Sequence, residues 1–391
     1  MNRMNKKRRV LHIIDSFGAG GAETWLLATV KYLNEHPELN THFDFLLSGG
    51  KEGIFDDEVR SYGSEIFYLK YSFNRIFAFR KAFRNILKLY QYDAIHDHQD
   101  FISGWHFLMG LGLLPEARIS HIHNPYNFVH NYVVSPLRWI SFRLGRGLMM
   151  RLAKNITGTS NSVMDEYGYN KLPYRKKRVR PAYCGFDVQK FSYREEAKGE
   201  LCNELGWERE FKIALFVGRI GLHDYDTAKN QKNPDFALSV ARVLVTNYPS
   251  WKFIFVGFKG KKGVELEEQI ICEGLGDKIK FLGFRDDIPK IMSASNVMIF
   301  PSLAEGLGMV AVEAQANGLN CIISEAIPIE AIVCKELVQV KPLKQGEESW
   351  AIAINQFESN GKVDRKHAEA KVLSSPYSIG NSVAFLLSLY E

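Results

Sequence analysis

The chain of 391 residues lacks the features that mark several classes of protein. Its five cysteines form no CxxC pair and show no metal-ligand spacing, which argues against a disulfide framework and favours a reducing compartment. No stretch approaches the ~20 apolar residues that span a membrane, and the apolar run after the basic opening is interrupted by His12 and Asp15. We therefore expect a cytoplasmic protein that is soluble or rests peripherally on the inner membrane face.

What is present is typical of a globular protein, with 46% hydrophobic and 24% charged residues. The formal net charge of +6 favours anionic ligands or a phospholipid surface and is too weak for a nucleic-acid-binding tail. A chain of this length exceeds one typical core, so we expect two domains.

Apolar runs alternate with amphipathic stretches in both halves of the chain. In the first half we expect helices at about 22–35 and 76–92, and strands at 9–15, 42–48, 65–69, 93–98, 118–124 and 154–160. In the second half we expect helices at about 234–247, 264–274 and 309–317, and strands at 211–220, 251–257, 278–283, 296–302 and 320–324. This alternation predicts an α/β protein with parallel, doubly wound sheets.

The charged segment 170–192, with two prolines and a glycine, is interpreted as the connection between the domains. The predicted domains are 1–190 and 191–375, followed by a last helix at about 376–391.

The loop FGAGGAE (17–23) follows the first strand and opens the first helix. Gly20 and Gly21 would let backbone N–H groups approach an anion at the positive helix end. The dinucleotide fingerprint G-x-G-x-x-G fails because Glu23 stands where its last glycine belongs, which argues against a NAD-dependent oxidoreductase. A tight turn that needs positive φ is the alternative interpretation.

Basic residues follow the first strand of the second half, in VGRIGLHDYDTAKNQKNP (217–234). Arg219 and Lys232 suit a diphosphate, one as a fork of donors and the other as a point charge. Lys229 could take the place of Lys232. The alternative interpretation is that Arg219 and the lysine are solvated loop residues that bind no ligand.

Two histidine-rich stretches end predicted strands. HDHQD (96–100) offers His96, His98 and Asp100, which could suggest a metal site, but no matching cluster is found elsewhere in the sequence. HIHN (121–124) similarly ends a strand, and a lone histidine is usually structural. We favour polar strand ends for both stretches and predict no metal.

Residues 138–154 combine Arg138, Arg143, Arg146, Arg151 and Lys154 with large apolar side chains. Such a helix docks on anionic lipid headgroups or simply covers a sheet.

The stretch PSLAEGLGMVAVEAQ (301–315) places Glu305 and Glu313 across a predicted strand–loop–helix junction. Gly306 and Gly308 would free backbone N–H groups at the helix start for phosphate oxygens, and the carboxylates would accept hydrogen bonds from sugar and ribose hydroxyls. Two surface glutamates would not explain the glycines.

The segment Glu305 to Glu313 resembles the E-x7-E signature of retaining glycosyltransferases of family 4, which have the GT-B fold of two facing Rossmann-like domains with a cleft between them. FLGFRDDIPKIMSASNVMIFPSLAEGLGMVAVEAQANG (281–318), VGR (217–219), QKNP (231–234), GGAE (20–23) and ISHIHN (119–124) resemble the family's other blocks, in family order. The chain is most similar to bacterial enzymes of exopolysaccharide and capsule assembly.

The resemblance implies roles for individual positions. Arg219 and Lys232 would hold the donor diphosphate, and Glu305 would contact the transferred sugar. Glu313 would take the ribose hydroxyls, and His123 would sit beside the sugar and the acceptor hydroxyl. Backbone groups would make the other contacts to the nucleotide sugar. Gly20 and Gly21 would close over the phosphates, Gly283, Phe284 and Arg285 would lie against the nucleobase, and Gly306, Leu307, Gly308 and Met309 would support the sugar.

The implied reaction is metal-independent, retaining transfer from a nucleotide diphosphate sugar, with a UDP-sugar favoured, to a saccharide or a polyprenyl-diphosphate-linked saccharide. No cofactor is expected besides this co-substrate. Two alternatives share the donor site: a GT-B NDP-sugar epimerase, and a non-catalytic protein that binds sugar nucleotides. RKKRVR (175–180) and the basic helix would favour residence at an anionic membrane surface.

Overall fold

The computed structural model describes residues 7–18, 20–126, 129, 133–171, 179–221, 231–357 and 364–391. Two compact units divide the chain. Unit 1 combines Met1–Phe186 with Pro376–Glu391, and unit 2 is Asp187–Ser375. Lys229 and residues 175–178 of the basic segment lie outside the described residues.

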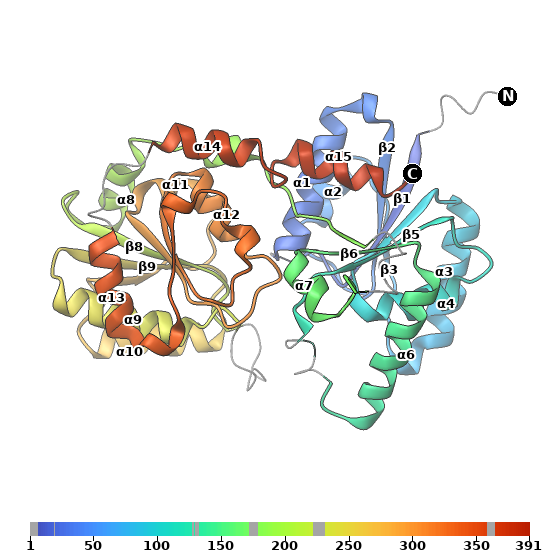
Figure 1. Ribbon diagram of the computed structural model, residues 1–391, viewed down its shortest axis with the longest axis horizontal. Helices are drawn as coiled ribbons and strands as arrows, with labels where there is room; N and C mark the ends of the chain where they lie inside the picture. Colours follow the sequence, from blue (N-terminus) through green and yellow to red (C-terminus); the bar gives the residue numbers. More distant parts are fainter. Residues whose placement is uncertain are drawn as a thin grey trace. The chain divides into compact units, whose positions relative to one another are not determined.

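Unit 1 is built on a parallel sheet of seven strands in the order β3-β2-β1-β4-β5-β6-β7 (Figure 1). The strands are β1 (Arg8–Ile14), β2 (Thr41–Leu47), β3 (Ile66–Tyr68), β4 (Ala94–Asp97), β5 (Ala117–Ile122), β6 (Asn155–Gly158) and β7 (Arg180–Pro181). The helices are α1 (Gly21–Glu35), α2 (Asp56–Ser61), α3 (Ile76–Tyr90), α4 (Ser103–Gly110), α6 (Pro136–Leu152), α7 (Asn161–Glu166) and α15 (Ile379–Ser388). The central strands are continuous buried runs, as expected when helices cover both faces of a sheet.

The chain leaves the centre of this sheet in two directions. From β1 it builds outward through β2 and β3, and it then returns to place β4 on the other side of β1. The carboxyl ends of β1 and β4 therefore flank a topological switch point, which is where doubly wound sheets place their ligands.

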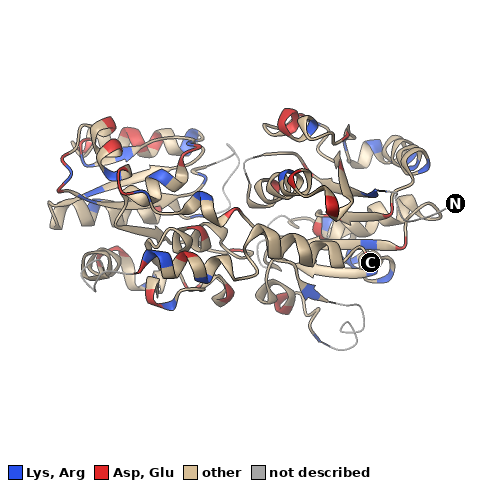
Figure 2. Ribbon diagram, turned by 90° about the horizontal axis from the view of Figure 1, so that it is seen from above, with Lys and Arg blue, Asp and Glu red and all other residues tan. Residues whose placement is uncertain are grey.

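The C-terminal helix α15 belongs to unit 1 although unit 2 precedes it in the sequence. Trp25 of α1 donates its indole N–H to Ser382 Oγ at 3.0 Å, and Ser382 Oγ donates to the Tyr183 carbonyl at 2.8 Å. Helix α15 contains no charged residue (Figure 2), and its end buries Tyr390 among side chains of the sheet. The last residues of the chain thus complete the core of its first half.

Unit 2 repeats the arrangement with a parallel sheet of six strands in the order β10-β9-β8-β11-β12-β13. The strands are β8 (Lys212–Val217), β9 (Trp251–Val256), β10 (Ile279–Phe281), β11 (Val297–Phe300), β12 (Asn320–Ile323) and β13 (Val338–Val340). The helices are α8 (Ala197–Leu205), α9 (Pro234–Asn247), α10 (Lys261–Cys272), α11 (Ile288–Ala294), α12 (Met309–Ala316), α13 (Gly346–Phe357) and α14 (Arg365–Leu373). Its switch point lies between β8 and β11, and its core contains the buried Trp251 and Trp350.

The prediction of an α/β protein with doubly wound parallel sheets is confirmed, and every strand predicted by range is present. The interpretation of 170–192 as connection alone is wrong in part, because β7 lies within that segment and pairs with β6. A two-residue edge strand that includes Pro181 has no alternating pattern to reveal it. The pattern also did not predict strand β13 or the helices α2, α4, α7, α8, α11, α13 and α14.

Helix α6 covers the segment predicted to be basic and amphipathic. The Ser135 hydroxyl accepts a hydrogen bond from the Arg138 backbone N–H at 3.3 Å, and Pro136 occupies the first helical position. These are standard signals for a helix start.

No helix among the described residues combines the length and the apolar character needed to cross a membrane.

Candidate functional site

The candidate site of unit 2 lies at the carboxyl edge of its sheet, beside the switch point. Arg219 follows β8, Lys232 precedes α9, and Glu305 follows β11. All six strands are parallel, so their carboxyl ends share this edge. The structure therefore brings Lys232 and Glu305 into contact, although they are 73 positions apart in the sequence.

Lys232 and Glu305 form an ion pair at this edge. The Lys232 Nζ atom donates to Glu305 Oε1 at 2.6 Å, and the Ser302 hydroxyl donates to the same oxygen at 2.8 Å. Lys232 also lies over the Phe300 ring, at 4.7 Å from its centroid. Both side chains are largely buried, so a charged partner and hydrogen bonds are needed to offset the cost of removing them from water. The pair fixes the Lys232 ammonium group, with Glu305 as its counter-ion, at the carboxyl end of β11.

Gly308 sets the start of helix α12 behind this pair. Its φ of 92° lies in the left-handed region, which favours glycine. A Cβ at this position would stand 3.1 Å from the Phe300 ring and 3.3 Å from an Ile327 methyl carbon. The glycine thus lets the loop after β11 turn directly into a helix, whose first N–H groups carry partial positive charge.

Glu313 lies one turn into α12 and is partly buried. Burial raises its pKa to about 7, and the positive charge of Lys232 opposes that shift. Glu313, the second glutamate of the E-x7-E pair, is therefore close enough to Lys232 to interact with its charge. Both glutamates singled out from the sequence therefore belong to one charged environment.

The other predicted donor residues lie along the same edge. Arg219 is exposed at the end of β8. Gly283 has a φ of 68°, and its carbonyl accepts the Gly257 backbone N–H at 2.8 Å. Phe284 is 58% exposed. The Arg285 guanidinium binds the carboxylates of Glu204 and Asp287, at 2.5 Å for Glu204 Oε1 and 2.8 Å for Asp287 Oδ1, so this side chain is held by protein carboxylates.

In unit 1 the predicted glycine loop lies at the start of α1, after β1. Gly20 is the N-terminal cap of α1 and Gly21 is its first residue. A Cβ on Gly20 would collide with the Glu23 carboxylate. Because the Glu23 carboxylate is the far end of a flexible side chain that can move aside, this contact does not require glycine at the cap, but it places an acidic side chain at the helix end.

His123 follows β5, at the carboxyl edge of the sheet of unit 1. Its backbone N–H donates to Asp100 Oδ1 at 2.8 Å, and the Asn124 amide donates to Asp100 Oδ2 at 3.1 Å. Asp100 has a φ of 46° and is buried, which raises its pKa to about 6. Burial lowers the pKa of His123 to about 4, so its imidazole is neutral at physiological pH.

His123 is one of five histidines from three adjacent strands whose rings contact one another. They are His12 of β1, His96 and His98 at β4, and His121 and His123 at β5. Burial lowers the pKa of all five imidazoles. Sequence reasoning did not single out His12 or His121 as site residues. The signal that could have found them is the histidine spacing of two along neighbouring strands, which places the side chains on one face.

HDHQD and HIHN do end neighbouring strands, but the expectation that HDHQD has no matching cluster elsewhere is wrong, because histidines of the two stretches contact each other. His98 Nδ1 lies 2.9 Å from His123 Nε2, and His96 Nε2 lies 3.2 Å from His121 Nδ1. Asp100 does not join His96 and His98, because it binds the backbone of His123 and Asn124 instead.

Two overlapping triads among these histidines bring ring nitrogens within 4.8 Å of one another: His12, His96 and His98, and His98, His121 and His123. Imidazole nitrogens suit a transition metal, but in this arrangement they hydrogen-bond to one another.

Comparison with known proteins identifies the class to which these two sites belong. Residues 19–190 match the family model described as "Glycosyltransferase Family 4", and residues 198–371 match "Glycosyl transferases group 1". The protein is a glycosyltransferase. It belongs to the glycosyltransferases with a family 4 domain followed by a group 1 domain.

Relatives with assigned names agree with this class. The chain is 26% identical to the "Putative glycosyltransferase EpsF" of Bacillus subtilis over 99% of this chain and 97% of that protein. It is 26% identical to the "Capsular polysaccharide biosynthesis glycosyltransferase CapH" of Staphylococcus aureus over 81% of this chain and 80% of that protein. A third relative, also 26% identical, is the "UDP-Gal:alpha-D-GlcNAc-diphosphoundecaprenol alpha-1,3-galactosyltransferase" of Escherichia coli, over 73% of this chain and 72% of that protein.

Solved structures support the fold. The chain superposes on HepE of Anabaena in complex with UDP with a TM-score of 0.73, at 18% identity, over 97% of this chain and 98% of that one. A glycosyltransferase from Rickettsia africae gives a TM-score of 0.74 at 17% identity, over 98% of each chain. The prediction of the GT-B class is confirmed.

Proposed function

We propose that the protein transfers a glycosyl unit, with retained anomeric configuration and without a metal ion, from a nucleotide diphosphate sugar to a hydroxyl of a saccharide acceptor. The observation that carries the proposal is the Lys232–Glu305 pair at the switch point of unit 2, next to the glycine-initiated start of α12. Lys232 and Arg219 supply positive charge for a diphosphate. Glu305 and Glu313 supply acceptors for sugar and ribose hydroxyls.

In the proposed reaction the bond from the anomeric carbon to the diphosphate oxygen breaks, and a bond from that carbon to the acceptor oxygen forms on the same face. The acceptor's proton passes to the leaving diphosphate. Negative charge grows on the diphosphate as the bond breaks, so Arg219, Lys232 and the N–H groups at the start of α12 stabilise the transition state. The imidazole of His123 is neutral and contributes hydrogen bonding beside the sugar rather than charge.

A thermal-shift panel of UDP-, GDP- and ADP-sugars tests the donor site. A nucleotide sugar that binds the folded protein raises its melting temperature. We expect a shift with UDP-sugars that is lost in Arg219→Ala and in Glu313→Ala. A folded protein that no nucleotide sugar shifts would contradict the proposal.

Transfer itself is measured with the donor that binds, with saccharide and polyprenyl-diphosphate-linked saccharide acceptors, in buffer with and without a chelator. We expect a product that keeps the donor's anomeric configuration by NMR and a rate that the chelator leaves unchanged. A product with inverted configuration would contradict the retaining mechanism. Loss of turnover in the chelator would contradict metal independence. Release of free, epimerised sugar without an acceptor would point to the epimerase alternative, and binding without turnover to a non-catalytic protein.

For the acceptor we propose a lipid-linked saccharide of cell-surface polysaccharide assembly. The relatives from E. coli and S. aureus support this class, because their names give an undecaprenol-linked acceptor and a role in capsule synthesis. An acceptor of this class lies in a membrane, and helix α6 offers a surface that suits one. Leu137 is 80% exposed, and Ile140 and Leu144 are about half exposed. Arg143 is also exposed and lies over the Trp139 ring, at 4.8 Å from its centroid.

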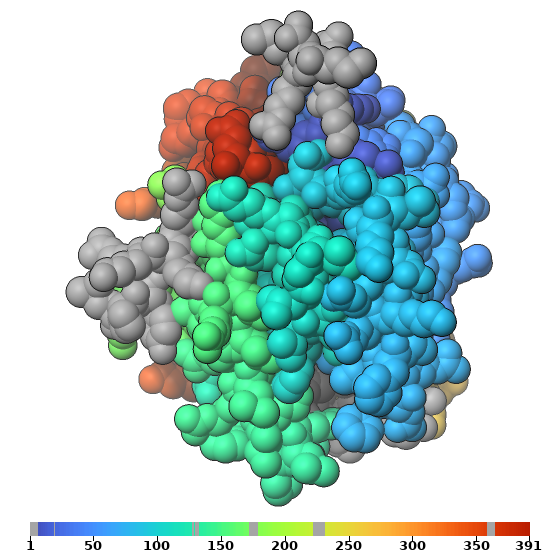
Figure 3. Space-filling view, turned by 90° about the vertical axis from the view of Figure 1, so that its right-hand side faces the viewer, coloured from blue at the N-terminus to red at the C-terminus, as the bar shows by residue number. Residues whose placement is uncertain are grey.

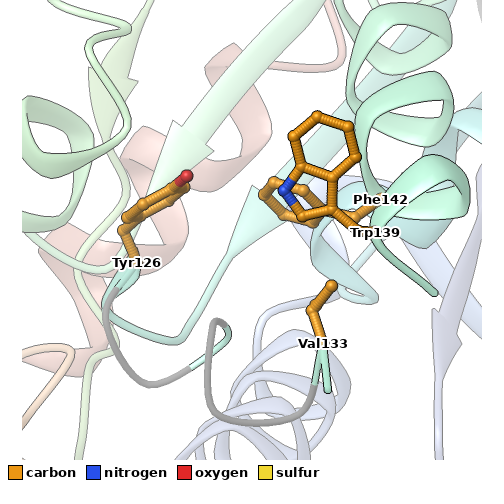
Figure 4. A pocket seen from close by; sticks show the side chains of 4 residues that line it. All are labelled: Tyr126, Val133, Trp139 and Phe142. Carbon is orange, nitrogen blue, oxygen red and sulfur yellow. The ribbon is translucent and has the colours of Figure 1, made fainter. Parts of the chain in front are cut away.

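Helix α6 lies at the surface of unit 1, where its teal and green atoms form the lower part of the face in Figure 3. An apolar hollow next to it is lined by Tyr126, Val133, Trp139 and Phe142 (Figure 4). Exposed apolar groups beside arginines are typical of a helix that rests in the headgroup region of an anionic membrane.

Vesicle co-sedimentation tests this surface. We expect binding to vesicles rich in phosphatidylglycerol at low salt, weaker binding at high salt, and a clear loss in Arg138→Glu/Arg143→Glu. Lys335→Glu/Lys366→Glu, at exposed lysines of unit 2, is the matched control for the change in net charge. Equal loss in the control, or no binding by the wild type, would contradict the membrane role of α6.

A further inference from the structure

The five histidines of unit 1 and Tyr390 form one continuous hydrogen-bonded chain. From the outer end, His123 Nε2 lies 2.9 Å from His98 Nδ1, and His98 Nε2 lies 3.0 Å from His12 Nδ1. His12 Nε2 lies 3.4 Å from the Tyr390 hydroxyl, which lies 2.9 Å from His96 Nδ1. His96 Nε2 lies 3.2 Å from His121 Nδ1. Each histidine-to-histidine contact therefore joins the Nε2 of one ring to the Nδ1 of the next.

This head-to-tail order restricts the protonation of the chain. A neutral imidazole has one N–H donor and one acceptor nitrogen, and a hydroxyl has one O–H donor. Every contact is a hydrogen bond, and the Tyr390 O–H proton is also used, only if all five rings carry their proton on Nε2 or all five carry it on Nδ1. A mixture would place two donors or two acceptors face to face, or would let the Tyr390 oxygen accept from both His12 and His96 and leave its own buried O–H unpaired. Each unsatisfied buried group costs about 1–3 kcal/mol.

The inner end of the chain distinguishes the two states. Within the described residues, Nε2 of the fully buried His121 has no hydrogen-bond partner. If the protons lie on Nε2, this end is an unpaired buried N–H group. If they lie on Nδ1, it is an unpaired acceptor. Among buried backbone groups an orphaned N–H donor is rarer than an under-satisfied acceptor, and we apply the same order to the imidazole. The Nδ1–H state therefore fits the structure better.

We infer that the chain locks all five histidines as Nδ1–H tautomers, so that His123 presents a fixed Nδ1–H donor to a sugar hydroxyl. In this state His121 donates to His96, His96 to Tyr390, Tyr390 to His12, His12 to His98, and His98 to His123. His98, His12, Tyr390, His96 and His121 are positioning residues, because they act on the substrate only through His123.

Two further observations agree with this assignment. His123 is the only one of the five rings that is not buried, so the open end of the chain lies at the carboxyl edge of the sheet. Burial depresses the pKa of each ring, which keeps the chain neutral at physiological pH. The inference rests on the proposed function: an Nδ1–H group cannot accept the acceptor's proton, which agrees with a reaction in which the leaving diphosphate takes it.

The tautomers are measured directly by NMR of the full chain labelled with ¹⁵N-histidine, at pH 7.5, because protonated and unprotonated ring nitrogens differ widely in chemical shift. We expect the five rings, assigned by single His→Gln variants, to show protonated Nδ1 and unprotonated Nε2. An Nε2–H tautomer at His123 would overturn the inference. So would stoichiometric metal in the purified protein with the shifts of metal-bound imidazoles.

Tyr390→Phe breaks the chain by removing one hydroxyl while keeping the ring. His96 and His121 should then become a mixture of tautomers, because either choice leaves them one unpaired buried N–H. His12, His98 and His123 should keep the Nδ1–H state, because the other state would leave a buried N–H at His12 Nε2 unpaired. With the UDP-sugar donor, kcat and KM should therefore change by less than about twofold.

Tyr92→Phe is the matched control, because it removes another buried hydroxyl of unit 1, which donates to Asp44 at 2.9 Å. The control should keep the wild-type imidazole spectrum and kcat, even if its melting temperature falls. Unchanged tautomers in Tyr390→Phe would overturn the inference. If Tyr390→Phe does not fold, the wild-type spectrum alone still decides. Turnover by the wild type tests the proposed function separately, since the tautomer spectrum requires no activity.

Discussion

The two units carry their candidate sites at the same place in the same kind of sheet, yet the sites differ in electrostatic character. In unit 2 the carboxyl edge beside the switch point holds Lys232 and Glu305 in an ion pair, with Glu313 in reach of the lysine. In unit 1 the corresponding edge holds neutral imidazoles that hydrogen-bond to one another. One site suits an anionic diphosphate and the other suits uncharged hydroxyl groups. The sheet thus fixes where a ligand binds, and the side chains decide which charge it carries.

Lowering the pH should have the largest effect, because it is expected to change the stability of the two units in opposite directions. In the folded state the pKa of the five clustered histidines of unit 1 lies below the usual 6.5, at about 3 for His12 and about 4 for His123. Their contribution to the free energy of unfolding is therefore fully present above pH 6.5 and is lost as the pH falls, because protons then bind the unfolded state more strongly. Folding raises the pKa of Glu313 to about 7, so the stabilising contribution of its protonated carboxyl is fully present below pH 4.5 and is lost as the pH rises towards 7. Between pH 6.5 and 5 we expect unit 1 to lose about 1.4 kcal/mol per pH unit for each histidine that stays neutral, while the Glu313 term favours unit 2.

Native-state hydrogen exchange at pH 6.5 and pH 5, corrected for intrinsic rates, measures both units in one experiment. Protection of β4 and β5 should fall on acidification, and protection of β11 and β12 should fall less. In Glu313→Gln the favourable term of unit 2 should disappear. Equal loss of protection in the two units would break the comparison.

Removal of the positive charge at the edge of unit 2 should have the next largest effect. Lys232→Ala leaves the largely buried Glu305 without its cation and removes stabilisation of the leaving diphosphate, so kcat/KM should fall about 10²–10³-fold. The control is Lys262→Ala, whose half-exposed lysine pairs with Asp235 at 2.9 Å and should leave kcat/KM unchanged. Equal activity of the two variants would exclude Lys232 from diphosphate binding and point to Lys229.

Removal of the imidazole at the edge of unit 1 should leave donor binding intact. His123→Ala should lower kcat about tenfold to a hundredfold, because one or two hydrogen bonds to the sugar or acceptor are lost. The thermal shift produced by UDP should persist, because the proposed diphosphate contacts, Arg219 and Lys232, belong to unit 2. His36→Ala, at a part-exposed ring elsewhere in unit 1, serves as the control. A lost UDP shift in His123→Ala would show that the division of roles between the units is wrong.

A change of backbone conformation should have the smallest effect. Gly308→Ala forces a Cβ into a left-handed conformation beside Phe300 and Ile327, so the free energy of unfolding should fall by about 1–3 kcal/mol, with weaker UDP-sugar binding. Gly276→Ala, where the new Cβ meets only Ile271 atoms at 3.7 Å or more, should leave both unchanged. Chemical denaturation and the same thermal-shift panel measure the two quantities. Normal binding by a destabilised Gly308→Ala would show that the loop only supports the fold.

Much of the fold could be predicted because long apolar runs and helical periodicity are local properties of the chain. The buried runs VMIF and FIFV gave β11 and β9, and the alternation of strands and helices gave the doubly wound sheets. The short edge strand β7 could not be predicted, because two residues are stabilised by pairing with β6 rather than by their own pattern. The same limit applies to the pairing of Lys232 with Glu305, which depends on contacts between segments 73 residues apart.

The sequence by itself determined the α/β class, the glycines that suit the helix starts at Gly20 and Gly308, and the spacing of Glu305 and Glu313. These features depend on residues that are neighbours along the chain. Only the tertiary structure decided that His12, His96, His98, His121 and His123 share one face of three parallel strands, and that Tyr390 closes their chain from the far end of the sequence. The physical reason is that strand order and register, together with the docking of the last helix, are set by burial of side chains from distant segments, and only that burial brings these nitrogens within hydrogen-bond distance.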